Sequence, residues 1–113
     1  MRTDRERLED ILGAIAQIEQ YTLEGKPAFD RNRLLQDGIV QQIVIIGEAV
    51  RAISPELRER KSDLPWAAMV AMRNILVHRY YEVNLESVWL VVEQNLPDLK
   101  EKIEGILQEL GEA

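Results

Sequence analysis

The feature that most constrains the fold is the spacing of the apolar residues, which recur every three or four positions along most of the chain. Between residues 30 and 53 the gaps are 4, 4, 3, 4 and 3, and the residues that set them are Leu35, Ile39, Ile43, Ile46, Val50 and Ile53. This period places one apolar face along an α-helix, whereas a half-buried strand needs strict alternation. No alternating stretch of useful length occurs, so the pattern predicts an all-α protein.

Start and stop signals divide the pattern into helices. Thr3 and Glu6 are spaced as a capping box, which predicts the start of a first helix. The apolar face of that helix is formed by Leu8, Ile11, Leu12, Ile15 and Ile18. Gly25-Lys26-Pro27 is expected to end it. The second helix, roughly residues 30–53, is expected to end at Ser54-Pro55, with a polar turn over residues 56–61.

Two further helices complete the expected fold. Asp63-Leu64-Pro65-Trp66 is typical of a helix start, because proline is tolerated in the first turn. The helix that follows carries Met69, Val70 and Met72. The last helical segment carries Leu85, Val88, Val92, Leu96, Leu99, Ile103, Ile106 and Leu110, and Pro97 is expected to kink or restart it. We therefore expect one domain, residues 1–113, folded as an antiparallel bundle of four to five helices.

The composition argues against several chemistries. The chain has no cysteine, which excludes disulfides and thiolate metal sites, and its single histidine argues against zinc, so we expect no metal and no cofactor. Neither a G-x-x-x-x-G-K-[ST] phosphate loop nor a G-x-S-x-G serine motif occurs. The N-terminus is charged with no apolar stretch behind it, and the longest apolar runs fall far short of the ~20 residues of a membrane span. We therefore expect a cytoplasmic protein.

The charge is acidic overall but unevenly distributed. The formal net charge of −6 argues against a protein that binds nucleic acid over its whole surface. Residues 51–79, however, contain six basic and three acidic side chains, a net +3. An excess of this size often arises by chance, so it is weak support for a local anion-binding surface.

One eight-residue run, Arg73-Asn74-Ile75-Leu76-Val77-His78-Arg79-Tyr80, concentrates the polar groups suited to catalysis, including the only histidine. Histidine exchanges protons near neutrality because its unperturbed pKa is about 6.5. Arginine binds phosphate through a fork of N–H donors. A proton carrier beside a phosphate clamp is the minimum equipment for phosphodiester chemistry, although a lone histidine near a helix end is more often structural.

The spacing within this run limits its geometry. On one helix Asn74 lies beneath His78, at i and i+4, and can orient the imidazole. Arg73 and His78 are five residues apart, so they diverge by about 140° on a straight helix. Either the helix loosens between them or a second chain completes the site. If the chain becomes extended after His78, then Tyr80 points the same way as His78 and Tyr81 the other way, packed against the bundle.

Gly47 and Glu48 stand out within the apolar second helix. A glycine inside a helix costs about 1 kcal/mol relative to alanine, so Gly47 suggests close packing of another helix. Glu48 is either a solvated carboxylate, the commoner fate of a surface acid, or a contact of the His78 cluster. Arg79 is a second candidate for such a contact.

At these residues the chain resembles the HEPN superfamily and, within it, the HepT-like toxins. The family motif R-x-x-x-x-H-x-Y is matched by Arg73, His78 and Tyr80, with Asn74 in the polar position after the arginine. Similarity extends over nearly the whole length, through Ile46-Gly47-Glu48-Ala49, Leu64-Pro65-Trp66, Val88-Trp89 and Leu96-Pro97.

The resemblance implies a metal-independent endoribonuclease that acts as the toxin of a type VII-like toxin–antitoxin module. In that family the histidine, here His78, acts as general acid and base, and the arginine, here Arg73, stabilises the transition state of 2′-hydroxyl attack on RNA, while Asn74 orients the histidine or the substrate. The proteins dimerise so that two motifs share one cleft. A minimal nucleotidyltransferase antitoxin silences the toxin by transferring AMP to the motif tyrosine, here Tyr80.

Two alternatives to a nuclease remain open. The chain could be a binding module, the nucleotide- or substrate-binding partner of a nucleotidyltransferase, in which Arg73 and His78 hold phosphate without cleaving it. Its acidic charge favours that interpretation mildly. A plain dimerisation bundle accounts poorly for the polar cluster at residues 73–80. For a dimer, apolar positions on the motif and final helices are candidate contacts, among them Met69, Met72 and Trp89.

Overall fold

The computed structural model describes residues 3–79 and 83–112, and within these ranges it is helical with no strand, which confirms the all-α prediction. The long helices are α1 (Asp4–Tyr21), α3 (Arg33–Ala52), α5 (Trp66–His78) and α7 (Leu96–Glu112). Three short helices join them, α2 (Gly25–Arg31), α4 (Pro55–Arg60) and α6 (Leu85–Leu90). A π-helical turn, η2 (Val91–Asn95), connects α6 to α7.

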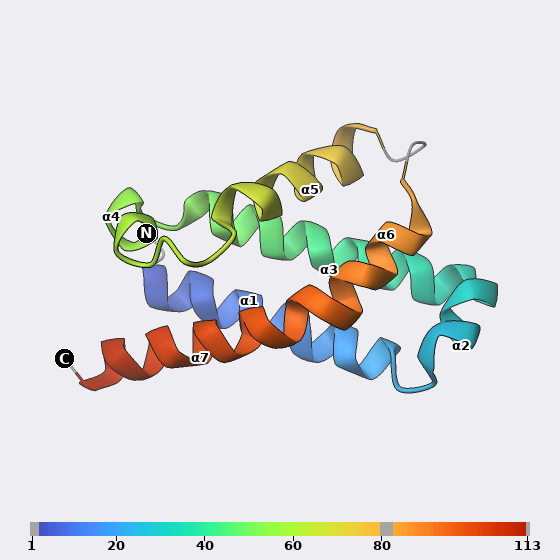
Figure 1. Ribbon diagram of the computed structural model, residues 1–113, viewed down its shortest axis with the longest axis horizontal. Coiled ribbons are helices and arrows are strands. Elements are labelled where there is room, and N and C mark those ends of the chain that lie inside the picture. Colours follow the sequence, from blue (N-terminus) through green and yellow to red (C-terminus); the bar gives the residue numbers. More distant parts are fainter. Residues whose placement is uncertain (1–2, 80–82, 113) are drawn as a thin grey trace.

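Helix α3 is the centre of the arrangement. It packs against α1 on one side and against α5 on the other, while α7 packs on α1 (Figure 1). Figure 1 shows α5 at the outer edge of the molecule, away from the α1–α7 pair. Helix α5, which carries the polar motif, therefore has one principal neighbour instead of a surrounding shell of helices.

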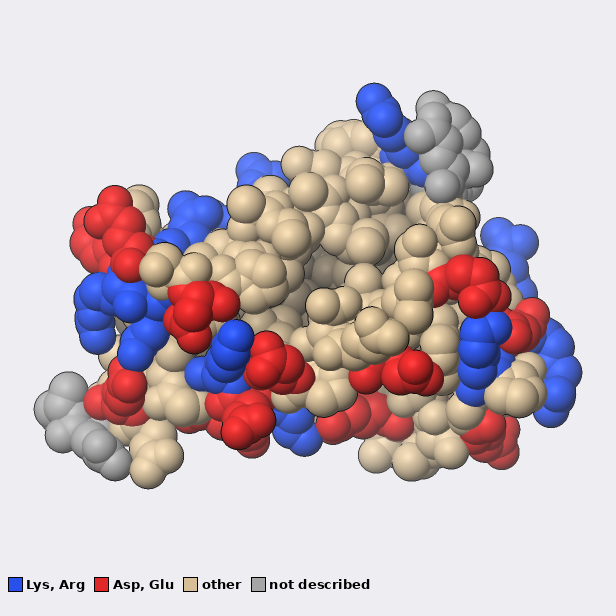
Figure 2. All heavy atoms as spheres, viewed as in Figure 1, with Lys and Arg blue, Asp and Glu red and all other residues tan. Residues whose placement is uncertain are grey.

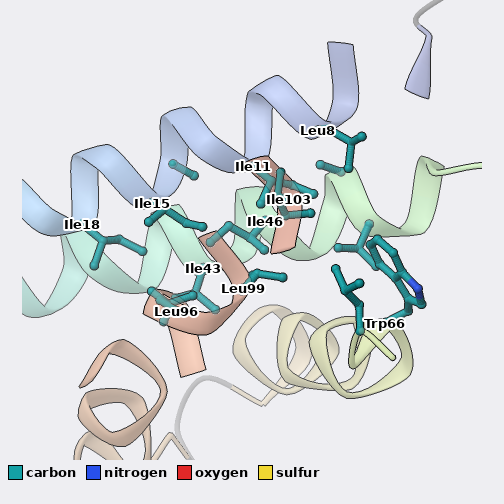
Figure 3. Close-up of a cluster of buried hydrophobic side chains, with 14 of the residues drawn as sticks. Leu8, Ile11, Ile15, Ile18, Ile43, Ile46, Trp66, Leu96, Leu99 and Ile103 are labelled. Atoms are coloured by element: carbon teal, nitrogen blue, oxygen red, sulfur yellow. The ribbon is translucent and has the colours of Figure 1, made fainter. Parts of the chain in front are cut away.

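The core forms where α1, α3 and α7 meet. Side chains from the three helices point toward one another in Figure 3, and those at the centre are Leu8, Ile11, Ile15, Ile18, Ile43, Ile46, Leu99 and Ile103. All of them are at most 5% exposed, and burial of one such side chain stabilises the fold by about 1.5–3 kcal/mol. The periodic apolar faces expected for these helices are the faces that the structure buries.

The predicted start of the first helix is confirmed, but its stop signal has a different role. The Thr3 hydroxyl accepts from the Glu6 backbone N–H at 3.2 Å, and the Glu6 carboxylate accepts from the Thr3 N–H at 3.1 Å. Helix α1 already ends at Tyr21. Gly25-Lys26-Pro27, expected to be a breaker, begins α2 instead: Gly25 has a φ of +81°, a left-handed conformation that reverses the chain before the new helix.

The second helix and the turn after it also differ in detail from the prediction. Helix α3 begins at Arg33, three residues later than expected, because the Asn32 side chain caps it by accepting from two backbone N–H groups of the first turn. The expected polar turn over residues 56–61 is mostly helix α4. Ser54 caps α4, and Leu57, which is 3% exposed, anchors it in the core.

Pro97 restarts the final helix, as predicted, through the π turn. A proline inside an α-helix lacks an N–H and clashes with the carbonyl four residues earlier. Here the Leu96 N–H donates to the Val91 carbonyl, five residues back, which widens the helix just before the proline. Helices α6 and α7 therefore remain joined end to end.

Gly47 sets the distance between α3 and α5, as the sequence suggested. A Cβ atom at this position would lie 2.2 Å from Arg73 Cβ and 3.2 Å from the Met69 backbone oxygen. Both lie on α5, so the absence of a side chain at Gly47 is what lets α5 approach α3 at Arg73.

We predict that Gly47→Ala destabilises the protein by about 1–3 kcal/mol, because the new methyl group forces α5 outward. Gly13→Ala is the matched control: Gly13 also lies within a helix, and a Cβ there meets nothing within 4 Å. The control should gain about 0.5–1 kcal/mol from helix propensity. Chemical denaturation of the two variants measures both effects, and equal stabilisation would show that the α3–α5 contact is not tight.

Candidate active site

Helix α5 is apolar on all sides except at the motif. Among residues 66–78 the only polar side chains capable of ionic or hydrogen-bonded contacts, apart from the Trp66 indole, are Arg73, Asn74 and His78. The Trp66 Nε1–H donates to the Lys61 carbonyl at 2.9 Å and fixes the start of the helix. Its end is at His78, where the Arg79 N–H donates to the Ile75 carbonyl.

Arg73 lies on the side of α5 that faces α3, and it pairs with Glu48. Arg73 Nε donates to Glu48 Oε1 at 2.8 Å, and Nη2 donates to the same oxygen. The Arg73 side chain is 13% exposed, whereas that of Glu48 is 49% exposed. Of the two interpretations of Glu48, the structure supports a contact with the cluster, although half of the carboxylate side chain still faces solvent.

Asn74 makes a different bond from the expected one. Its Oδ1 accepts from Arg73 Nη1 at 2.9 Å. His78, which was expected above it, is exposed, and its side chain forms no hydrogen bond with any residue in the part of the chain that the structure describes. One chain thus brings Arg73, Asn74 and Glu48 together and leaves His78 outside their network.

The helix stays regular through His78, so it does not loosen to bring His78 back toward Arg73. The two side chains leave α5 about 140° apart and about 7.5 Å apart along its axis. Of the two possibilities that the spacing allowed, loosening of the helix between Arg73 and His78 is therefore not observed.

The side of α5 turned away from α3 carries an apolar stripe whose residues are exposed, except for the half-buried Met72. It is formed by Ala68, Ala71, Met72 and Ile75, spaced as one helical stripe, and Ile75 is 43% exposed. Beside it a hollow of about 160 Å³ opens between α5 and the η2–α7 junction, with Ala68, Met69 and Met72 in its wall. Figure 2 shows this uncharged hollow in the middle of the molecule. We call the stripe of Ala68, Ala71, Met72 and Ile75 the outer stripe.

The three residues suggested for an interface, Met69, Met72 and Trp89, have different environments. Met69 and Met72 are half-buried at the hollow. Trp89 is only 8% exposed, its ring lies 5.1 Å from that of Phe29, and its Nε1–H donates to Glu93 at 3.1 Å. Trp89 belongs to the interior of the bundle, so its choice as a contact residue was wrong.

The last part of the motif lies only partly within the described structure. Arg79 caps the end of α5 and is exposed. Tyr80, the expected modification site, and Tyr81, expected to pack on the bundle, lie outside the described residues.

The basic excess of the middle segment is partly neutralised in the fold. Lys61 Nζ lies 2.7 Å from a Glu109 carboxylate oxygen on α7, and Arg73 is paired with Glu48. Among the described residues, no group of three or more His, Cys, Asp or Glu side chains could hold a metal ion. No helix within residues 3–79 and 83–112 is long and apolar enough to cross a membrane.

Comparison with known proteins gives a consistent family match. The family model described as Ribonuclease HepT-like covers residues 11–106. A protein of Methanocaldococcus jannaschii named "Gamma-glutamylcyclotransferase and putative RNase" is 39% identical over 104 residues, which are 91% of this chain and 47% of that protein. The chain therefore spans about half the length of that relative.

Other relatives match along nearly their whole length. A protein of Caldanaerobacter subterraneus named "Putative RNase" is 33% identical over 112 residues, 96% of this chain and 97% of the relative. A "Probable ribonuclease HepT" of Thermococcus cleftensis is 34% identical over 106 residues, 93% of this chain and 96% of the relative. No solved structure shows significant similarity to the chain.

Proposed function

The chain belongs to the HepT-like ribonuclease family, and from this premise we propose that it is a metal-independent endoribonuclease. Its substrate is RNA, cut by attack of a ribose 2′-hydroxyl on the adjacent phosphate. The observation that carries the proposal is the concentration of Arg73, Asn74 and His78 on a helix that is otherwise apolar. Polar side chains on such a helix need a reason other than packing.

In the proposed reaction His78 moves protons and Arg73 stabilises charge. A histidine removes the 2′-hydroxyl proton as the oxygen attacks phosphorus, and the bond from phosphorus to the 5′-oxygen breaks. A proton returns to that leaving oxygen, and the products are a 2′,3′-cyclic phosphate and a 5′-hydroxyl. Arg73 donates hydrogen bonds to the phosphate oxygens, whose negative charge grows in the transition state.

We further propose that the active species is a homodimer. It is supported by the exposure of His78, by the divergence of Arg73 and His78 along α5, and by the exposed residues of the outer stripe. A helix that is apolar on most of its surface is normally buried on most of it, and α5 is covered chiefly by α3. A two-fold contact through α5 buries the outer stripe and brings the motif of one chain toward that of the other.

The first test concerns the catalytic pair. His78→Ala and Arg73→Ala should each lower RNA cleavage by about 10²–10⁴-fold, because each removes a group that acts in the transition state. Wild-type cleavage should survive chelators and leave 2′,3′-cyclic phosphate ends, detected by mass spectrometry of the fragments. Arg60→Ala on α4 removes the same charge at an exposed position and should stay active. Full activity of a folded His78→Ala protein would refute the mechanism, and phosphate binding without cleavage by the wild type would favour the binding-module alternative.

The second test concerns the dimer. Ala71→Glu places a charge in the outer stripe and should give a monomer without ribonuclease activity, because a buried unpaired carboxylate is costly. Ala16→Glu makes the same change at an exposed position of α1 and should leave a dimer. Light scattering measures the mass, and an active monomeric wild type at nanomolar concentration would contradict the proposal.

The partner that we propose is a minimal nucleotidyltransferase antitoxin that attaches AMP to Tyr80. Tyr80 is two residues beyond His78, and α5 ends at His78, so the acceptor follows directly after the helix. An added phosphate next to the motif brings negative charge to the place where RNA phosphate binds, and this would silence the toxin.

Mass spectrometry after co-expression with such a nucleotidyltransferase should show one added AMP. The adduct should disappear in Tyr80→Phe and persist in Tyr81→Phe, because adjacent side chains point to opposite sides if a segment is extended. Tyr80→Phe should also remain toxic in the presence of the partner. Loss of the adduct in Tyr81→Phe alone would assign the modification to the other tyrosine.

A further inference from the structure

We infer that Glu48 is a positioning residue, which holds the Arg73 guanidinium in the orientation needed to bind the reacting phosphate. The part of this inference that concerns turnover rests on the proposed ribonuclease function. The part that concerns orientation rests on the contacts between α3 and α5.

The hydrogen bonds of Arg73 to Glu48 and Asn74 use three of the N–H donors of its guanidinium. A guanidinium has five N–H donors. Nε and one N–H of Nη2 go to Glu48 Oε1, and one N–H of Nη1 goes to Asn74 Oδ1. Among the residues that the structure describes, no partner takes the second N–H of Nη1 or of Nη2, and these are the two donors that a guanidinium needs to bind two oxygens of a phosphate.

The backbone explains why Glu48 is the residue in this place. Arg73 Cβ and Cγ lie directly over Gly47, the residue before Glu48. One turn of α3 therefore does two things: Gly47 leaves room for the aliphatic part of Arg73, and Glu48 supplies the carboxylate that pairs with its guanidinium. The Arg73 side chain is only 13% exposed, so its stem is largely buried, and its head meets the half-exposed Glu48 carboxylate where it emerges from the α3–α5 contact.

Glu48 fixes the orientation of the Arg73 guanidinium and does not itself attract the RNA. Its carboxylate offsets the charge of Arg73 at long range, so it weakens the pull of the site on RNA. A fixed guanidinium, in contrast, meets the phosphate oxygens without reorganisation as their charge develops. An interaction of this kind raises kcat and does not lower KM.

The experiment compares Glu48→Ala with Glu48→Gln in the full-length protein on a mixed-sequence RNA. Both bonds from Arg73 end on Oε1, an acceptor that the glutamine carbonyl can replace. Glu48→Ala should lower kcat on the order of 10²-fold without raising KM, and Glu48→Gln should stay within about 10-fold of the wild type. Equal losses in the two variants would show that only the charge matters and would overturn the positioning role.

Glu19→Ala is the matched control. Glu19 is 52% exposed at its side chain, much like Glu48, and it also pairs between helices, with Lys100 at 3.1 Å. Its loss should leave kcat unchanged. In an Arg73→Ala background, Glu48→Ala should have no further effect, because the residue through which it acts is gone. Thermal melting of each variant confirms that it is folded.

A second readout separates this inference from the proposed function. The NMR signal of the Arg73 Nε–H should be sharp in the wild type, shift on addition of inorganic phosphate, and broaden in Glu48→Ala. An inactive wild type with this behaviour refutes the ribonuclease and supports the positioning role. An active wild type with unchanged kcat in Glu48→Ala, or the same Arg73 signal in both proteins, overturns the positioning role and leaves the ribonuclease intact.

Discussion

The contact between α3 and α5 at Gly47 is the constraint on which the rest of the motif depends. Helix α5 packs chiefly on α3, and the contact is close because one residue of α3 has no side chain. That closeness draws the stem of Arg73 across α3 and brings its head to Glu48. The Arg73–Glu48 ion pair therefore depends on the close packing of α3 and α5, since a wider spacing between the helices would separate the two side chains.

The long helices could be predicted from the sequence because their burial is periodic. The period of α1, α3 and α7 extends over many turns, so each apolar face is determined by several residues at once. The short helices could not be predicted this way. Helix α4 is fixed by one cap and one buried side chain, Leu57, and α2 by the conformation of Gly25 and burial of Phe29. A single buried residue has no period to detect.

The candidate site was predictable in its composition but not in its contacts. The sequence singled out Arg73, Asn74 and His78 and indicated close packing at Gly47. It could not show that Asn74 bonds to Arg73 instead of His78, because helical spacing favours contacts at i and i+4, whereas adjacent residues do not normally face each other. The pairing of Glu48 with Arg73 spans 25 positions and follows from the α3–α5 register, which local patterns do not contain.

The exposed apolar residues of the outer stripe also suggest a role for the acidic net charge of the chain. A protein with an exposed apolar helix is prone to indiscriminate association and precipitation. A net charge of −6 gives copies of the chain a net mutual repulsion, which opposes such association. Only an orientation in which the apolar surfaces fit closely gains enough contact energy to overcome that repulsion. In the proposed dimer, the surplus of acidic groups would therefore oppose nonspecific association and favour the one contact that buries the outer stripe.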